Sequence, residues 1–96
     1  MNIDFNKNEG ILNIALDGRL DTTTAPELES FIGKNCADVD GIKIDCEKLS
    51  YISSAGLRVL LSAQKKMKGA VKLKNVNELV MEVLEMTGFV DILTIE

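Results

Sequence analysis

Two adjacent serines, Ser53 and Ser54, stand where an alternating segment ends and a helical one begins. Serine is favoured just before a helix, because its hydroxyl oxygen accepts a hydrogen bond from a backbone N–H that has no partner in the helix. The other free N–H groups and the helix dipole make this position favourable for a negative group. A phosphoryl group on one serine would add about −1.5 to −2 charges at pH 7. The pattern predicts either a plain helix cap or a hydroxyl that can carry a switching charge.

Arg58 follows Ser54 by four residues, which places both on one face of a helix, one turn apart. An arginine there either pairs with a phosphate on the serine or extends into solvent. Catalysis by Ser54 would need a base to activate its hydroxyl. The chain contains no histidine, and no lysine stands at a spacing that supports a Ser–Lys pair. We therefore expect a binding protein and not an enzyme.

The composition further limits the domain organisation and the functions that are possible. The 96 residues fit one domain over 1–96, with 11 basic against 15 acidic residues and a net charge of −4. This mild acidity argues against nucleic acid as a partner. Phosphate-loop and EF-hand spacings are missing, so we expect no cofactor and no metal. The isolated thiols Cys36 and Cys46, and the lack of a signal peptide or membrane span, predict a cytoplasmic protein.

The elements that must position the serines follow from hydrophobic spacing. Alternation predicts strands over 2–5, 11–17, 42–47 and 70–74, with a short strand or irregular tail over 90–95. Helical spacing predicts helices from Thr24 to about 35–37, over 54–68, and from an Asn77 cap through Thr87. Thr24 and Glu27 form a capping-box pattern, and Leu79 is expected on the inner face of the last helix.

This order, β-β-α-β-α-β-α, predicts a small open mixed sheet of the α/β class. The first two strands are close enough to form an antiparallel hairpin, and the strand–helix–strand units require parallel pairing with right-handed crossovers. The strands alternate strictly, whereas strands buried on both faces are apolar throughout. We therefore expect the helices mainly on one face of the sheet, with the other face largely exposed to solvent.

Several segments resemble the STAS domain, and more narrowly the bacterial anti-sigma factor antagonists. The resemblance lies in Gly18-Arg19-Leu20-Asp21, the helix after it, Ile42–Leu49, and Ile52-Ser53-Ser54-Ala55-Gly56-Leu57. It covers nearly the whole chain, including its length and the order of its elements. The resemblance implies a STAS-like fold and a regulator that acts by binding another protein.

In that family the resemblance implies a switch set by phosphorylation. The cognate anti-sigma factor is a serine kinase that phosphorylates the first serine of an Asp-Ser-Ser-Gly-Leu or Asp-Ser-Thr-Gly-Leu run, and a serine phosphatase resets it. By position the acceptor is Ser54, and Asp21 corresponds to a family aspartate near the site. Two positions depart from the family pattern: Ser53 replaces the aspartate, and Ala55 replaces the second hydroxyl residue. Ser53 is therefore a rival acceptor.

The resulting prediction is an anti-sigma factor antagonist that binds its kinase and is switched off by phosphorylation at Ser54. The expected contact surface comprises Asp21, Thr22, Thr23, Thr24, Ser53, Ser54, Gly56, Leu57 and Arg58. The protein is expected to be a monomer or a weak dimer. The alternative is a constitutive STAS interaction subunit of a transporter or scaffold complex, without phosphorylation; a module that binds a small molecule or nucleotide ranks below both.

Overall fold

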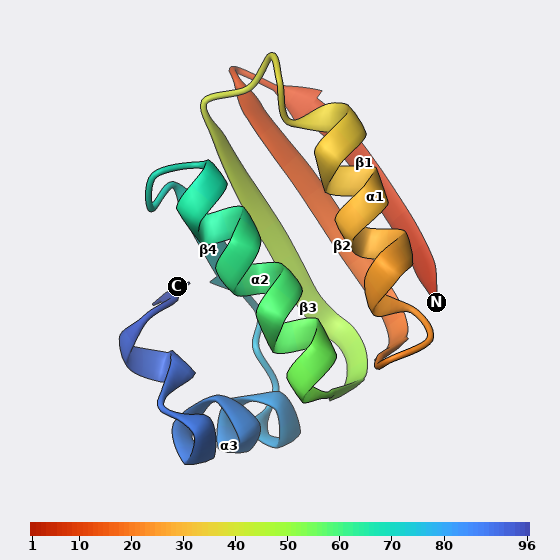
Figure 1. Ribbon diagram of the computed structural model, residues 1–96, viewed down its shortest axis with the longest axis vertical. Coiled ribbons are helices and arrows are strands. Elements are labelled where there is room, and N and C mark those ends of the chain that lie inside the picture. Colours follow the sequence, from red (N-terminus) through yellow and green to blue (C-terminus); the bar gives the residue numbers. More distant parts are fainter.

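Two helices lie across one face of a five-stranded sheet in the computed structural model, which describes residues 1–96 (Figure 1). The strands lie in the order β1-β2-β3-β4-β5; β1 pairs with β2 antiparallel, and the remaining pairs are parallel. Their bounds are β1 Asn2–Asn8, β2 Ile11–Leu20, β3 Gly41–Ile52, β4 Val71–Lys74 and β5 Thr94–Ile95. The helices are α1 Ala25–Asn35, α2 Ser54–Lys66 and α3 Glu78–Thr87, followed by the short 3-10 helix η1 Phe89–Asp91. The predicted α/β class and mixed sheet are confirmed.

The core lies between the sheet and the helices. Alternate residues of β2, namely Leu12, Ile14 and Leu16, are almost completely buried, whereas Asn13 and Ala15 between them are only half-buried. Figure 1 shows α1 and α2 lying side by side across the same face of β2 and β3. The strict alternation of the sequence therefore reflects a sheet with one covered and one open face, as predicted.

Strand β3 is longer than the alternation predicts, because it contains two irregularities. Ala15 pairs with Asp45, but Asp17 pairs with Lys48, and a second shift follows between Gly18 and Arg19. Each shift adds a residue to β3 and reverses which side chains face the core, so the period of two is lost after residue 46. The predicted end of this strand at residue 47 is therefore wrong. The strand continues to Ile52, directly before the serines.

Two further expectations are wrong. The Thr24 hydroxyl forms no capping box, because it donates to the Arg19 carbonyl at 2.6 Å and accepts from the Asp21 N–H at 2.9 Å. Leu79 is not on the inner face of α3, since 52% of it is exposed.

The predicted Asn77 cap is confirmed: its side chain accepts from the Val80 N–H at 3.0 Å. The C-terminal tail forms η1 and then the short strand β5.

The two cysteines are free and buried. Burial raises the pKa of the Cys46 thiol to about 12, and the neighbouring Asp45 carboxylate adds to this effect. A thiol with so high a pKa is protonated and a poor nucleophile at neutral pH.

None of the three helices is long and apolar enough to cross a bilayer.

Gly56 allows the start of α2 to pack closely against the sheet. A Cβ atom at this position would lie 2.7 Å from Leu20 Cγ and 3.1 Å from Ile52 Cγ1, inside a core where both neighbours are buried. We predict that Gly56→Ala lowers the free energy of unfolding by about 1–2 kcal/mol, the cost of overpacking less the gain in helix propensity.

Gly33→Ala is the matched control, because a Cβ atom on this exposed glycine of α1 meets nothing within 4 Å. It should raise the free energy of unfolding by about 0.5–1 kcal/mol. Urea denaturation of both variants measures the two effects. A Gly56→Ala protein as stable as the Gly33→Ala protein would contradict the packing argument.

Candidate functional site

The site lies where the neighbouring parallel strands β2 and β3 end together. Leu20 pairs with Ile52, the last residue of each strand, and the Ser53 N–H donates to the Leu20 carbonyl at 2.9 Å. The loop that begins at Asp21 therefore starts beside the turn that contains the two serines. Loops at the carboxyl ends of parallel strands are common places for functional residues in open α/β sheets. The resemblance to the STAS domain implies that Asp21 lies close to the serines, and the structure places the two segments side by side.

Ser53 is the cap of α2. Its backbone is extended, with φ −102° and ψ 175°, and its side-chain oxygen accepts from the Gly56 N–H at 3.4 Å. Its carbonyl oxygen accepts from the Leu57 N–H at 2.9 Å, which starts the helix. Its hydroxyl therefore satisfies one of the N–H groups that a helix start leaves unpaired, and the residue is only half-exposed. Of the two candidate caps, the structure selects Ser53.

Ser54 is the first residue of α2, and it is exposed. The capping bond comes from its neighbour, so its own hydroxyl is not needed to start the helix. The first turn contains no acidic side chain that would repel a negative group. A charge placed here also lies at the positive end of the helix dipole. Ser54 thus combines access from solvent with a setting that tolerates a phosphate.

Asp21 fixes the neighbouring loop. Its Oδ1 accepts from the N–H groups of Thr23 at 3.0 Å and Thr24 at 3.1 Å. The Thr24 N–H does most to lower the pKa of this carboxyl below its usual value; partial burial opposes the shift, while bonds from Thr23 and the Thr24 hydroxyl and the Arg19 charge assist it. Asp21 therefore acts within its own loop, and it presents Thr22 and Thr23 to solvent.

Arg19 places a positive charge near the carboxyl ends of β2 and β3, and the sequence does not indicate its contacts. The Arg19 guanidinium lies over the Tyr51 ring at 4.3 Å, and its Nε is 3.6 Å from Asp21 Oδ2. Arg19 and Tyr51 are cross-strand partners. Because the two register shifts in β3 hide this pairing, no simple period in the sequence indicates it. The contact places a cation–π pair beside the Asp21 loop.

The expected contact surface divides into exposed and buried members. Ser54 and Arg58 are exposed, and they occupy successive turns of α2. Gly56 and Leu57 are buried, so they support the turn from within the fold. The exposed members thus come from the Asp21 loop and the first turns of α2, and the buried Gly56 and Leu57 lie beneath α2.

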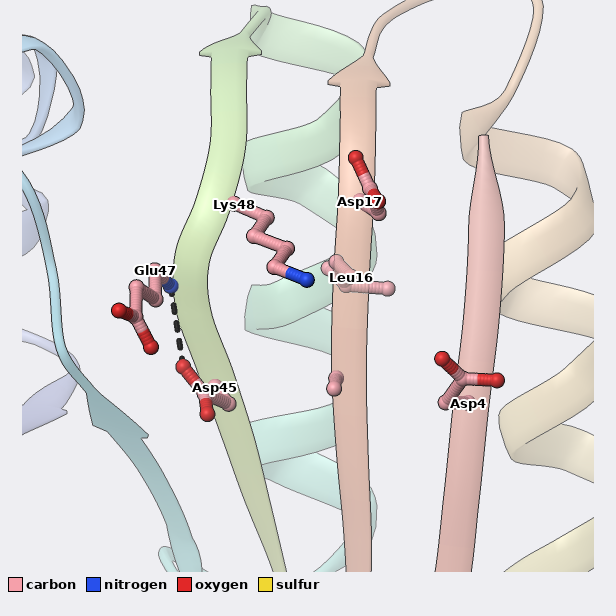
Figure 2. A pocket seen from close by; sticks show the side chains of 7 residues that line it. Asp4, Leu16, Asp17, Asp45, Glu47 and Lys48 are labelled. Atoms are coloured by element: carbon pink, nitrogen blue, oxygen red, sulfur yellow. Dashed lines mark hydrogen bonds between the residues drawn. The ribbon is translucent and has the colours of Figure 1, made fainter.

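The hollow in Figure 2 lies elsewhere, on the open face of the sheet. It has a volume of about 250 Å³ and is lined by Asp4, Ala15, Leu16, Asp17, Asp45, Glu47 and Lys48. It forms at the first irregularity of β3, where the Glu47 N–H donates to Asp45 Oδ1 at 3.0 Å. Burial, the largest single influence, raises the pKa of Asp45, but this N–H, the Asn75 amide and two lysines together lower it. Its carboxylates do not form a group suited to hold a metal ion.

Comparison with known proteins identifies the family of the chain. Residues 2–96 match the family model of the STAS domain. The chain is 29% identical over 98 residues to the anti-sigma-B factor antagonist of Bacillus subtilis (strain 168), covering 99% of this chain and 90% of that protein. It is 34% identical over 99 residues to BtrV of Bordetella bronchiseptica, named as a candidate anti-sigma factor antagonist, covering 96% of this chain and 83% of BtrV.

Solved structures share the fold. An anti-sigma factor antagonist from Mycobacterium paratuberculosis superposes with a TM-score of 0.87 at 22% identity, covering 98% of this chain and 83% of that one. The phosphorylated form of the Bacillus cell fate determinant SpoIIAA superposes with a TM-score of 0.74 at 18% identity, covering 99% and 91%. The family model, which matches residues 2–96, shows that the chain is a STAS domain, and the solved structures share its fold. Within this class, the chain belongs to the anti-sigma factor antagonist family, whose members are non-enzymatic regulators.

The depressed pKa of Asp21 yields a test of the loop. A carboxyl whose pKa is lower in the folded state stabilises the fold above its unfolded pKa of about 3.9, and this contribution is lost as the pH falls through the folded value. Asp21→Asn keeps an oxygen acceptor but removes the charge. We predict that the variant is less stable than the wild type at pH 7 and that the difference shrinks as the pH falls below about 4.

Denaturant unfolding of both proteins between pH 7 and pH 2.5 measures this difference. A stability gap that stays constant over the whole range would show that the Asp21 charge does not hold the loop.

Proposed function

We propose that this chain binds its cognate anti-sigma factor through the surface around Ser54 and releases it when Ser54 is phosphorylated. The partner is expected to be a serine kinase, and a serine phosphatase restores the binding form. The observation that carries this proposal is the division between the serines: Ser53 caps the helix, while Ser54 is exposed at its first position. The family assignment supports the nature of the partner.

The electrostatics favour a switch that leaves the fold intact. A phosphate on Ser54 would lie at the N-terminus of α2, where free N–H groups and the helix dipole stabilise it. In a complex the same dianion would be enclosed by the partner, and an unpaired buried charge costs several kcal/mol. Each tenfold loss of affinity needs only about 1.4 kcal/mol. One covalent change can therefore release the partner without unfolding the domain.

Ser53 favours the second candidate, a constitutive interaction subunit of a transporter or scaffold complex. The family places an aspartate before the acceptor, whereas Ser53 is neutral and its hydroxyl is engaged by Gly56. A kinase that reads the aspartate would not recognise this chain. The two candidates differ in one measurable property, the effect of a negative charge at residue 54.

Binding of the purified anti-sigma factor to Ser54→Ala and Ser54→Asp separates the candidates. Ser54→Ala should bind like the wild type, because the hydroxyl has no structural role, and Ser54→Asp should lose at least about tenfold in affinity. Ser62→Asp is the matched control, since Ser62 is an exposed serine further along the same helix. It should bind like the wild type.

Isothermal titration calorimetry measures the three dissociation constants. Equal affinity of Ser54→Ala and Ser54→Asp would refute the switch and favour the constitutive subunit. An equal loss in Ser54→Asp and Ser62→Asp would assign the effect to general charge and not to the site.

A further inference from the structure

Helix α3 leaves much of its apolar surface uncovered. It buries only Val80 and Leu84, while Leu79 is 52% and Met86 80% exposed. These two residues are seven apart and therefore share one face of the helix. Ile92, just after η1, is 47% exposed. Leu79, Met86 and Ile92, here called the C-terminal apolar surface, are three of the four large exposed hydrophobic residues of the molecule.

The charged side chains of this C-terminal segment have one sign. Between residues 75 and 96 the chain has five acidic residues and no lysine or arginine. Of these five, only Glu96 takes part in an ion pair, at 3.3 Å from Lys43. Glu82 lies between Leu79 and Met86 on the same side of α3. The segment that contains the C-terminal apolar surface thus has four carboxylates without an ion pair, those of Glu78, Glu82, Glu85 and Asp91.

This surface lies at the same end of the molecule as the Ser54 site. The Asn77 side chain, which caps α3, donates to the Leu49 carbonyl at 2.7 Å, and Leu49 precedes Ser54 by five residues in β3 and the turn. Figure 1 shows α3 and the start of α2 at the same end of the molecule's long axis. A protein that binds around Ser54 therefore docks at the end of the molecule that also contains α3.

We propose that the C-terminal apolar surface is a second docking contact for the anti-sigma factor, which covers it with an apolar groove bordered by lysine or arginine. This inference rests on the proposed function. Complementary charge argues for such a partner, because its cations would meet the unpaired carboxylates of α3. A second copy of the chain would place these like charges against one another, which disfavours a symmetric α3–α3 contact.

The test compares the affinities of four full-length proteins for the purified anti-sigma factor. The double variant Leu79→Ser/Met86→Ser should bind at least about tenfold more weakly than the wild type, because it removes apolar area from the contact. Glu82→Lys should also weaken binding. Glu9→Lys is its matched control, because Glu9 is exposed in the β1–β2 turn at the other end of the molecule, and it should bind like the wild type.

The outcomes separate this inference from the proposed function. Wild-type affinity of the double variant, or tighter binding by Glu82→Lys, would overturn the second contact while leaving the Ser54 switch in place. A wild-type protein that does not bind the anti-sigma factor would refute the proposed function and this inference with it. Sedimentation that shows a dimer of the wild type, lost in the double variant, would assign the surface to a second copy and also overturn the inference. A midpoint of thermal unfolding equal to that of the wild type shows that each variant is folded.

Discussion

The hydrogen bond from the Gly56 N–H to the Ser53 hydroxyl determines how the two serines are used. It assigns one hydroxyl to the helix cap and leaves the other exposed at the helix start. The bond depends on the packing beneath it, because Gly56 contacts Leu20 at a distance that admits no side chain. It also depends on the Ser53 N–H, which is held by the Leu20 carbonyl. The core and the site thus share the same few residues.

Parallel pairing of β2 and β3 makes the site a preformed surface. The last pair, Leu20 with Ile52, places the Asp21 loop and the serine turn next to each other. Bonds from Thr23 and Thr24 to the Asp21 carboxylate then fix the loop. We expect a site held by these bonds to keep its shape when it gains a charge. A switch at Ser54 would therefore act by repulsion and desolvation in the complex, and not by rearrangement of the free domain.

The sequence was sufficient to predict the α/β class, the open sheet face, the Asn77 cap and the position of the serines at a helix start. These features depend on local periods and on residues next to them in the chain. It did not predict the length of β3 or the Arg19–Tyr51 contact, because two added residues reverse the alternation in the middle of the strand. It placed Leu79 inside because helical spacing marks an apolar residue without showing whether a neighbour covers it. Thr24 matched a capping box, but its hydroxyl serves the loop instead.

The central claim is that Ser54, and not Ser53, is the hydroxyl available to a kinase. Tandem mass spectrometry of the wild type and Ser53→Ala, after incubation with the purified anti-sigma factor and ATP, tests it most directly. The account predicts a single phosphate on Ser54 in both proteins, with Ser53→Ala less stable by about 1 kcal/mol through loss of the cap. A phosphate on Ser53 in the wild type, or no phosphate on either serine, would contradict it.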